Sequence, residues 1–61
     1  MKFREVRRLL RADGWRRVRC GGSHEQWKHQ TKPGAVTVAG HDHADIAPKT
    51  LRSIERQAGW R

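Results

Sequence analysis

The fold of this chain is decided by residues 15–30, which read WRRVRCGGSHEQWKHQ. Two glycines, Gly21 and Gly22, separate residues 15–20 from residues 23–30, which alternate as a strand does. Adjacent glycines favour the positive φ angles that a two-residue hairpin turn requires. The stretch therefore predicts two antiparallel strands, residues 15–20 and 23–30, with the glycine pair as the turn between them.

A third strand is predicted for residues 35–40, which contain the β-branched side chains favoured in sheets. It follows Pro33-Gly34, a dipeptide that suits the two central positions of a type II turn. Residues 41–47 are expected to form a loop. The middle of the chain therefore predicts a three-stranded antiparallel sheet.

Helices are predicted at both ends of the chain. In residues 2–12 the apolar side chains recur at helical spacing with basic residues between them, and Asp13-Gly14 is a typical helix end. Pro48 suits the first turn of a second helix that closes at Gly59. The apolar stripes are Phe3, Val6, Leu9 and Leu10 in the first helix and Leu51, Ile54 and Ala58 in the second. The predicted fold class is α+β, in the order α-β-β-β-α.

The two assumed turns fix which residues share a face of the sheet, because side chains alternate along each strand. They pair Arg19 with His24, Arg17 with Gln26, Val18 with Glu25, Gln30 with Thr37 and His29 with Val38. Both helices are then expected on one face, over Val18, Cys20, Trp27, Val36 and Val38. The face turned away from the helices, termed the open face, carries Arg17, Arg19, His24, Gln26, Lys28, Gln30 and Thr37. A shift by one residue would exchange the two faces.

The length of 61 residues predicts one domain, residues 1–61, with a thin core. Cys20 is the only cysteine, so no disulfide within the chain is expected, as is typical of a reducing compartment. No apolar run reaches the roughly 18 residues needed to cross a bilayer, and no signal-peptide pattern opens the chain. We therefore expect a cytoplasmic protein without a membrane partner.

The charge of the chain indicates a polyanionic partner. Fourteen Lys and Arg residues oppose six Asp and Glu residues, which gives a formal net charge of +8. Residues 1–20 hold eight of the basic and two of the acidic side chains, and so carry +6 of that charge. Such a field attracts nucleic acids and accelerates their encounter with the protein. The alternative, a charged surface that only keeps the protein soluble, would need less charge than this.

His24 is the first candidate for a catalytic residue. Imidazole titrates near neutral pH and exchanges protons in transition states. RNA carries its own nucleophile, the 2′-hydroxyl, so its cleavage requires a base, an acid and cations near the phosphate, with no metal. The residues expected to hold RNA beside His24 are Arg17, Arg19, Gln26 and Lys28. Judged by spacing alone, a single surface histidine is more often a bystander than a catalyst.

The other reactive side chains are weaker candidates. His29 lies an odd number of residues from His24, so the two point to opposite faces of one strand, and a structural role is expected. His41 and His43 in the following loop either reach a phosphate or have no role. One cysteine without a CxxC or HxxxH pattern predicts no metal site, and Cys20 is expected to be inert packing.

The tryptophans favour packing over recognition. Trp15 and Trp60 are side chains on which RNA bases stack in other proteins. In a domain of this length, however, the core is the expected place for them. Trp27 is assigned to the core.

Several groups of residues occur in the order found in one known family. They are Glu5-Val6 with Leu9-Leu10, Asp13-Gly14-Trp15, Gly22-Ser23-His24 with Trp27 and His29, Thr37-Val38 with His41, and Thr50-Leu51-Arg52-Ser53-Ile54 leading to Ala58-Gly59. On these residues the chain resembles the HicA (YcfA-like) mRNA interferase toxins of bacterial toxin–antitoxin pairs, from about Lys2 to Gly59. Each group alone is weakly specific, whereas the ordered set is specific.

The resemblance implies a fold like that of double-stranded-RNA-binding domains. It implies metal-independent cleavage of mRNA by the histidine of the Gly-Ser-His segment, which is His24 here, with Gly22 and Ser23 as the supporting turn. It also implies a HicB-type antitoxin that binds the toxin and blocks its active surface. No cofactor is expected.

Two other function classes stay open at this point. A non-catalytic RNA-binding module of the same fold would bind RNA in a salt-dependent way but leave the strands intact. A basic protein–protein interaction domain would show no RNA affinity even at low salt.

Overall fold

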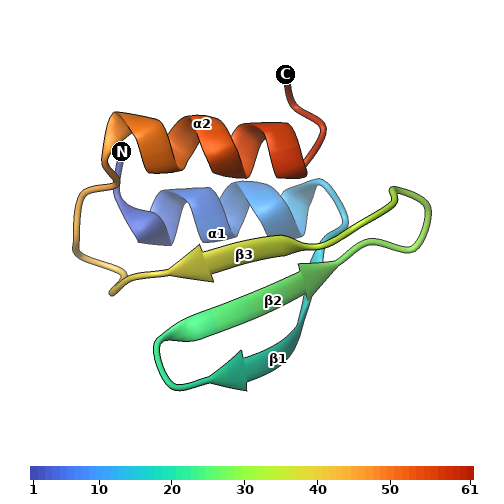
Figure 1. Ribbon diagram of the computed structural model, residues 1–61, viewed down its shortest axis with the longest axis horizontal. Coiled ribbons are helices and arrows are strands. Elements are labelled where there is room, and N and C mark those ends of the chain that lie inside the picture. The colour runs from blue at the N-terminus through green and yellow to red at the C-terminus, as the bar shows by residue number, and fades with distance from the viewer.

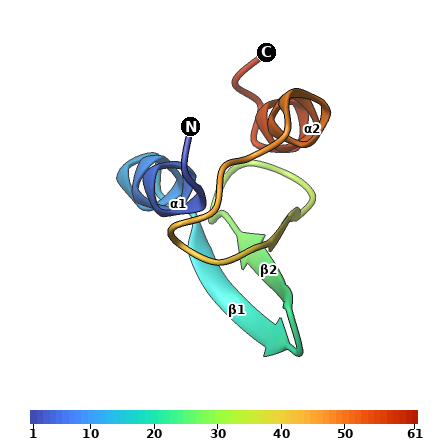
Figure 2. The same ribbon diagram turned by 90° about the vertical axis from the view of Figure 1, so that its left-hand side faces the viewer.

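The computed structural model describes residues 1–61 and has the predicted order of elements (Figure 1). The elements are α1 (Phe3–Ala12), β1 (Arg16–Gly21), β2 (His24–Lys28), β3 (Val36–Ala39) and α2 (Pro48–Gln57). The strands form one antiparallel sheet in the order β1-β2-β3. Both helices lie on the same side of this sheet, as the end-on view in Figure 2 shows. The predicted α+β fold is confirmed, and neither helix has the length and apolar character needed to cross a membrane.

The core fills the space between the two helices and one face of β2 and β3. Trp15 and Trp27 are its largest members, and each exposes no more than 1% of its surface. The other buried apolar residues are Phe3, Val6, Leu10, Val36, Val38, Ile46, Ile54 and Ala58, and Leu51 and Trp60 pack against them. The core positions predicted for the helices, β2 and β3 are therefore occupied as expected, except that Leu9 is only partly buried.

The tip of the first hairpin differs from the prediction. Gly21 still belongs to β1 and pairs with His24, so the turn consists of Gly22 and Ser23. Gly22 has φ +60°, whereas Ser23 has a negative φ, and this combination suits a type II′ turn. The turn therefore begins one residue later, and Arg19 pairs with Gln26 instead of His24.

A β-bulge at Val18 changes the predicted faces of the first half of β1. The pairing runs from Cys20–Glu25 and Arg19–Gln26 directly to Arg17–Trp27, so Val18 is the extra residue. At the tip, the pairing differs from the prediction by two residues, an even number that keeps Arg19 and Cys20 on their predicted faces. Beyond the bulge it differs by one residue, which exchanges the faces.

Three predictions for β1 are wrong, two of them because of the bulge. Arg17 pairs with Trp27 and so lies on the helix side of the sheet, not on the open face. Val18 was expected in the core, but the bulge leaves it 59% exposed. Cys20 pairs with Glu25 on the helix side as predicted, yet it is exposed because all of β1 extends beyond the cover of the helices (Figure 2).

The connection between β2 and β3 is longer than a two-residue turn. Residues 29–35 form it, so Gln26 pairs with Thr37 and Glu25 with Val38, and the predicted partners Gln30 and His29 lie in the loop. The displacement is four residues, again an even number, so Thr37 still lies on the open face and Val36 and Val38 in the core. Gln30 is exposed in the loop and takes no part in the open face.

His29 organises this loop, which confirms the structural role expected for it. Its Nδ1 accepts hydrogen bonds from the backbone N–H groups of Thr31 and Lys32, at 3.1 and 3.2 Å. Its Nε2 therefore carries the proton and donates to the carbonyl oxygen of Asp13 at 2.7 Å. Gly14, with φ +101°, permits this contact, since a Cβ there would lie 2.8 Å from Nε2. The imidazole is thus fully used in holding the loop against the end of α1.

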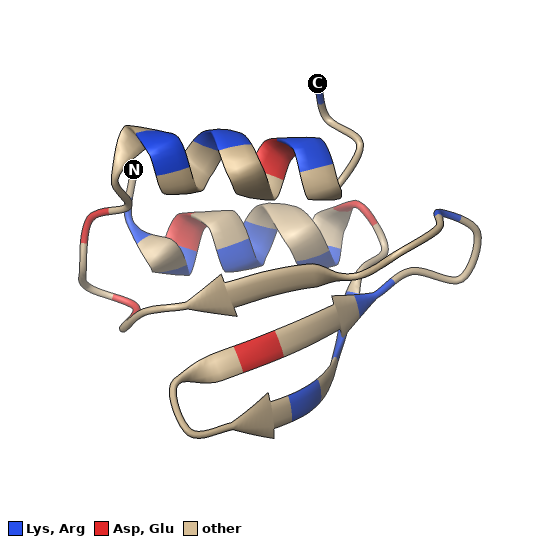
Figure 3. Cartoon of the chain, viewed as in Figure 1, with Lys and Arg blue, Asp and Glu red and all other residues tan.

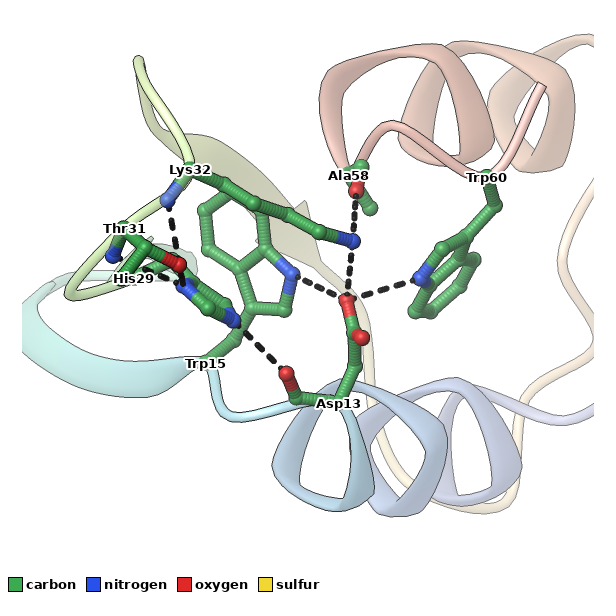
Figure 4. Close-up of polar contacts among 7 residues, drawn as sticks. All are labelled: Asp13, Trp15, His29, Thr31, Lys32, Ala58 and Trp60. Carbon is green, nitrogen blue, oxygen red and sulfur yellow. Dashed lines mark hydrogen bonds and ion pairs between the residues drawn. The ribbon is translucent and has the colours of Figure 1, made fainter.

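Asp13 joins three distant parts of the chain (Figure 4). Its Oδ2 accepts hydrogen bonds from Nζ of Lys32 at 2.7 Å and from the indole nitrogens of Trp15 and Trp60 at 2.9 and 3.1 Å. Lys32 also donates to the carbonyl oxygen of Ala58 at the end of α2. The hydrogen bonds from Lys32 and Trp60 lower the pKa of Asp13 to about 2. This carboxylate therefore ties the ends of both helices to the loop between β2 and β3.

The lowered pKa of Asp13 predicts a specific acid sensitivity. Because the folded pKa of about 2 lies below the ordinary value of 3.8, the ionised carboxylate stabilises the fold above about pH 4 and loses that effect as the pH falls toward 2. Asp13→Asn should lower the melting temperature at pH 6, and the difference from the wild type should shrink as the pH approaches 2. Thermal unfolding followed by circular dichroism between pH 2 and 6 measures both. A difference that stays constant over this range contradicts the assignment.

Candidate functional site

His24 is the first residue of β2 and directly follows the Gly22-Ser23 turn. It pairs with Gly21 on one side and Ala39 on the other, and its side chain lies on the open face. The residue is exposed, and its imidazole forms no hydrogen bond or ion pair within the chain. Both ring nitrogens are therefore free to exchange protons with a bound molecule.

Basic side chains flank His24 on the open face. Arg19 pairs with Gln26, two residues along β2 from His24, and Arg16 pairs with Lys28 two residues further on. Arg16, Arg19 and Lys28 are exposed and form no ion pair, so their charges are available to a ligand. Of the predicted site, Gln26, Lys28 and Arg19 share the open face with His24, whereas Arg17 does not. Arg16, opposite Lys28, lies on the open face in its stead.

Sequence reasoning missed Arg16 because nothing near Val18 marks a bulge directly. One indirect signal was present. Strict alternation along residues 15–20 places Trp15 and Cys20 on opposite faces, so a fully apolar face cannot include both. The need to bury Trp15, the larger of the two side chains, indicates an irregularity in this strand.

A buried ion pair lies on the other side of β2, directly behind His24. Glu25 and Arg7 of α1 are each only 7% exposed. The guanidinium donates from Nε to Oε1 of Glu25 at 3.1 Å, and its Nη2 lies 3.1 Å from Oε2. Arg7 also donates to Asp42 Oδ1 at 2.6 Å and to the carbonyl oxygen of Gly40.

Glu25 is equally well satisfied. Its Oε1 also accepts a hydrogen bond from the indole nitrogen of Trp27 at 2.9 Å, and Arg17 approaches its Oε2 at 3.4 Å. Burial works to raise the pKa of Glu25, but the hydrogen bonds from Arg7 and Trp27 and the nearby positive charges outweigh it and lower the pKa. Burial likewise works to lower the pKa of Arg7, and its bonds to Glu25 and Asp42 raise it. Both side chains are therefore held in their charged forms.

This ion pair fixes the surroundings of His24. Arg7 connects α1 to β2 through Glu25 and to the end of β3 through Gly40 and Asp42. Glu25 is the neighbour of His24 in sequence, and Gly40 follows Ala39, the cross-strand partner of His24. The backbone on both sides of the candidate site is thus anchored to α1.

The fold and the site together define a class of protein. A three-stranded sheet covered on one face by two helices, with free basic side chains and a histidine on the other face, is consistent with a fold like that of double-stranded-RNA-binding domains. Residues 3–60 match the family described as HicA toxin of bacterial toxin–antitoxin systems. The chain belongs to this HicA toxin family, which confirms the resemblance found in its sequence. No curated protein matches the chain.

The ion pair behind His24 predicts a large effect of a single substitution. Glu25→Ala removes the buried carboxylate that pairs with Arg7 and leaves the guanidinium only its contacts to Asp42 and Gly40, which should lower the free energy of unfolding by about 3 kcal/mol. His24→Ala is the matched control, since this exposed side chain has no partner and its loss should cost less than about 0.5 kcal/mol. Urea unfolding of both variants measures the two values. A cost of Glu25→Ala as small as that of His24→Ala contradicts the anchoring role.

Proposed function

We propose that this protein is the toxin component of a type II toxin–antitoxin pair and cleaves mRNA in the cytoplasm without a metal, with His24 as the proton-transferring residue. Membership of the HicA toxin family supports the assignment to a toxin–antitoxin system. The observation that supports the activity is the free imidazole of His24 on a face with three unpaired cations. The predicted residues Gly22 and Ser23 form the turn that presents it.

The proposed reaction uses the 2′-hydroxyl of the RNA as nucleophile. Its oxygen forms a bond to the adjacent phosphorus while the bond from phosphorus to the 5′-oxygen breaks, which leaves a 2′,3′-cyclic phosphate and a 5′-hydroxyl. His24 either removes the proton of the attacking hydroxyl or supplies a proton to the leaving 5′-oxygen. Arg19 and Lys28, with Arg16, would stabilise the charge that builds up on the phosphate oxygens, and Gln26 would hydrogen-bond the strand.

An antitoxin of the HicB type is the proposed protein partner. The formal net charge of +8 favours a partner with an acidic surface. Covering the open face would hide His24 and its cations together, which stops cleavage without any change in the fold of the toxin.

The proposed role of His24 is tested by His24→Ala. Loss of the proton-transferring group should slow cleavage of a single-stranded RNA by about 10²- to 10⁴-fold. Lys49→Ala on the exposed start of α2 is the control and should cleave at the wild-type rate. Cleavage is followed on labelled RNA in the presence of EDTA, and circular dichroism checks that each variant is folded.

The outcomes separate the proposed function from its alternatives. Cleavage by folded His24→Ala at the wild-type rate rejects His24 as the catalytic residue. RNA binding without cleavage by the wild-type protein indicates a non-catalytic RNA-binding module. The absence of RNA affinity at low salt indicates a protein–protein interaction domain instead.

A further inference from the structure

A groove runs along the helix side of the first hairpin, on the face of β1 and β2 opposite His24. Its main depression has a volume of about 630 Å³ and is lined by no apolar residue. The lining includes Arg4 and Arg11 from α1, Arg17 from β1, and His41 and His43 from the loop after β3.

The groove extends in both directions from this depression. It shares Arg11 and Arg17 with a second depression of about 490 Å³ that reaches Gly14 at the end of α1. It shares His41 with a third one, of about 200 Å³, that reaches Gly22 and Ser23. The groove therefore extends from the end of α1 to the turn that immediately precedes His24.

The groove carries more positive than negative charge, since four arginines and two carboxylates line its main depression. Lys and Arg recur along α1 and β1, the two elements on either side of it (Figure 3). Glu25 and Asp42 also line the groove and neutralise Arg7, and Glu25 lies 3.4 Å from Arg17 as well. Arg4 and Arg11 form no ion pair. The guanidinium carbon of Arg11 lies 5.1 Å from the centre of the Trp27 ring, which holds this side chain at the wall of the groove.

We propose that this groove binds the phosphate backbone of the RNA strand that is cleaved at His24. Guanidinium groups bind phosphate with short, charge-assisted hydrogen bonds. Arg4 and Arg11 present two unpaired guanidinium groups along the groove, and Arg17, whose contact to Glu25 is long at 3.4 Å, presents a third. The identity of the ligand as RNA rests on the proposed function. The strand lies between α1 and β1, crosses the hairpin tip beside Gly22 and Ser23, and enters the open face at His24.

The chemistry of the lining favours a phosphate backbone over a protein partner. Protein interfaces obtain most of their affinity from apolar and aromatic side chains that are buried at the centre. The main depression offers none of these, and Trp15 and Trp27 at its end are already buried in the core. Its lining of arginines, histidines and two carboxylates provides contacts to charge and none to a hydrophobic anchor.

The proposal is tested by binding in the absence of cleavage. A single-stranded 2′-O-methyl RNA oligonucleotide lacks the nucleophile, so its affinity can be measured whichever residue is catalytic. The double variant Arg4→Gln/Arg11→Gln removes two charges from the groove. The matched control, Arg52→Gln/Arg56→Gln, removes two exposed and unpaired charges from α2. Fluorescence anisotropy over a range of salt concentrations gives the affinity and its salt dependence.

The groove variant should lose about tenfold in affinity at 0.1 M salt, and the slope of log K against log salt should fall by about 1.4, or about 0.7 for each lost phosphate contact. The control should keep the wild-type slope. If Arg11→Gln weakens the fold through the lost Trp27 contact, Arg4→Gln alone should lower the slope by about 0.7. Equal losses in the two double variants overturn the proposal. So does unchanged RNA binding combined with loss of an acidic protein partner.

Discussion

The ion pair between Arg7 and Glu25 is the constraint on which the rest of this small structure depends. Placing two charges in a core costs several kcal/mol for each ion and is repaid only when nearly every polar atom finds a partner. Here Arg7 reaches Glu25, Asp42 and Gly40, while Glu25 also accepts from Trp27. These bonds form together only when α1, β2 and the end of β3 are in one register. The pair thus specifies the arrangement of the strands, which a thin apolar core specifies weakly.

The order of the elements and most of the core were predictable from the sequence because both follow from periodicity. Val36, Val38 and Trp27 reach the core although the predicted pairing of β2 and β3 was wrong by four residues, since an even displacement preserves the face. Register itself depends on the length of each connection. The loop after β2 owes its length to His29, whose bonds to Thr31 and Lys32 replace the expected tight turn. No local sequence pattern predicts those hydrogen bonds.

The candidate site was predictable only in part, for the same reason. His24, Gln26 and Lys28 belong to one strand without irregularities. Side chains alternate along such a strand, so the even spacing of these three residues placed them on one face. Arg16 and Arg17 lie on the far side of a bulge, where strict alternation assigned Arg17 to the open face instead of Arg16. The anchoring pair was missed because charged residues were read as surface, although Glu25 alternates with Trp27, and Arg7 lies among Phe3, Val6 and Leu10 in the apolar stripe of α1.

The exposed state of β1 connects the architecture to the proposed chemistry. An edge strand without helical cover is a liability, because its free backbone groups invite pairing with other chains. In this protein the bulge at Val18 and a row of arginines make such pairing unfavourable. The same absence of cover leaves both faces of β1 open to solvent, with Arg17 on one side and Arg19 on the other. A strand of RNA can therefore contact cations on both faces only by passing around the tip, and the first side chain after that tip is His24.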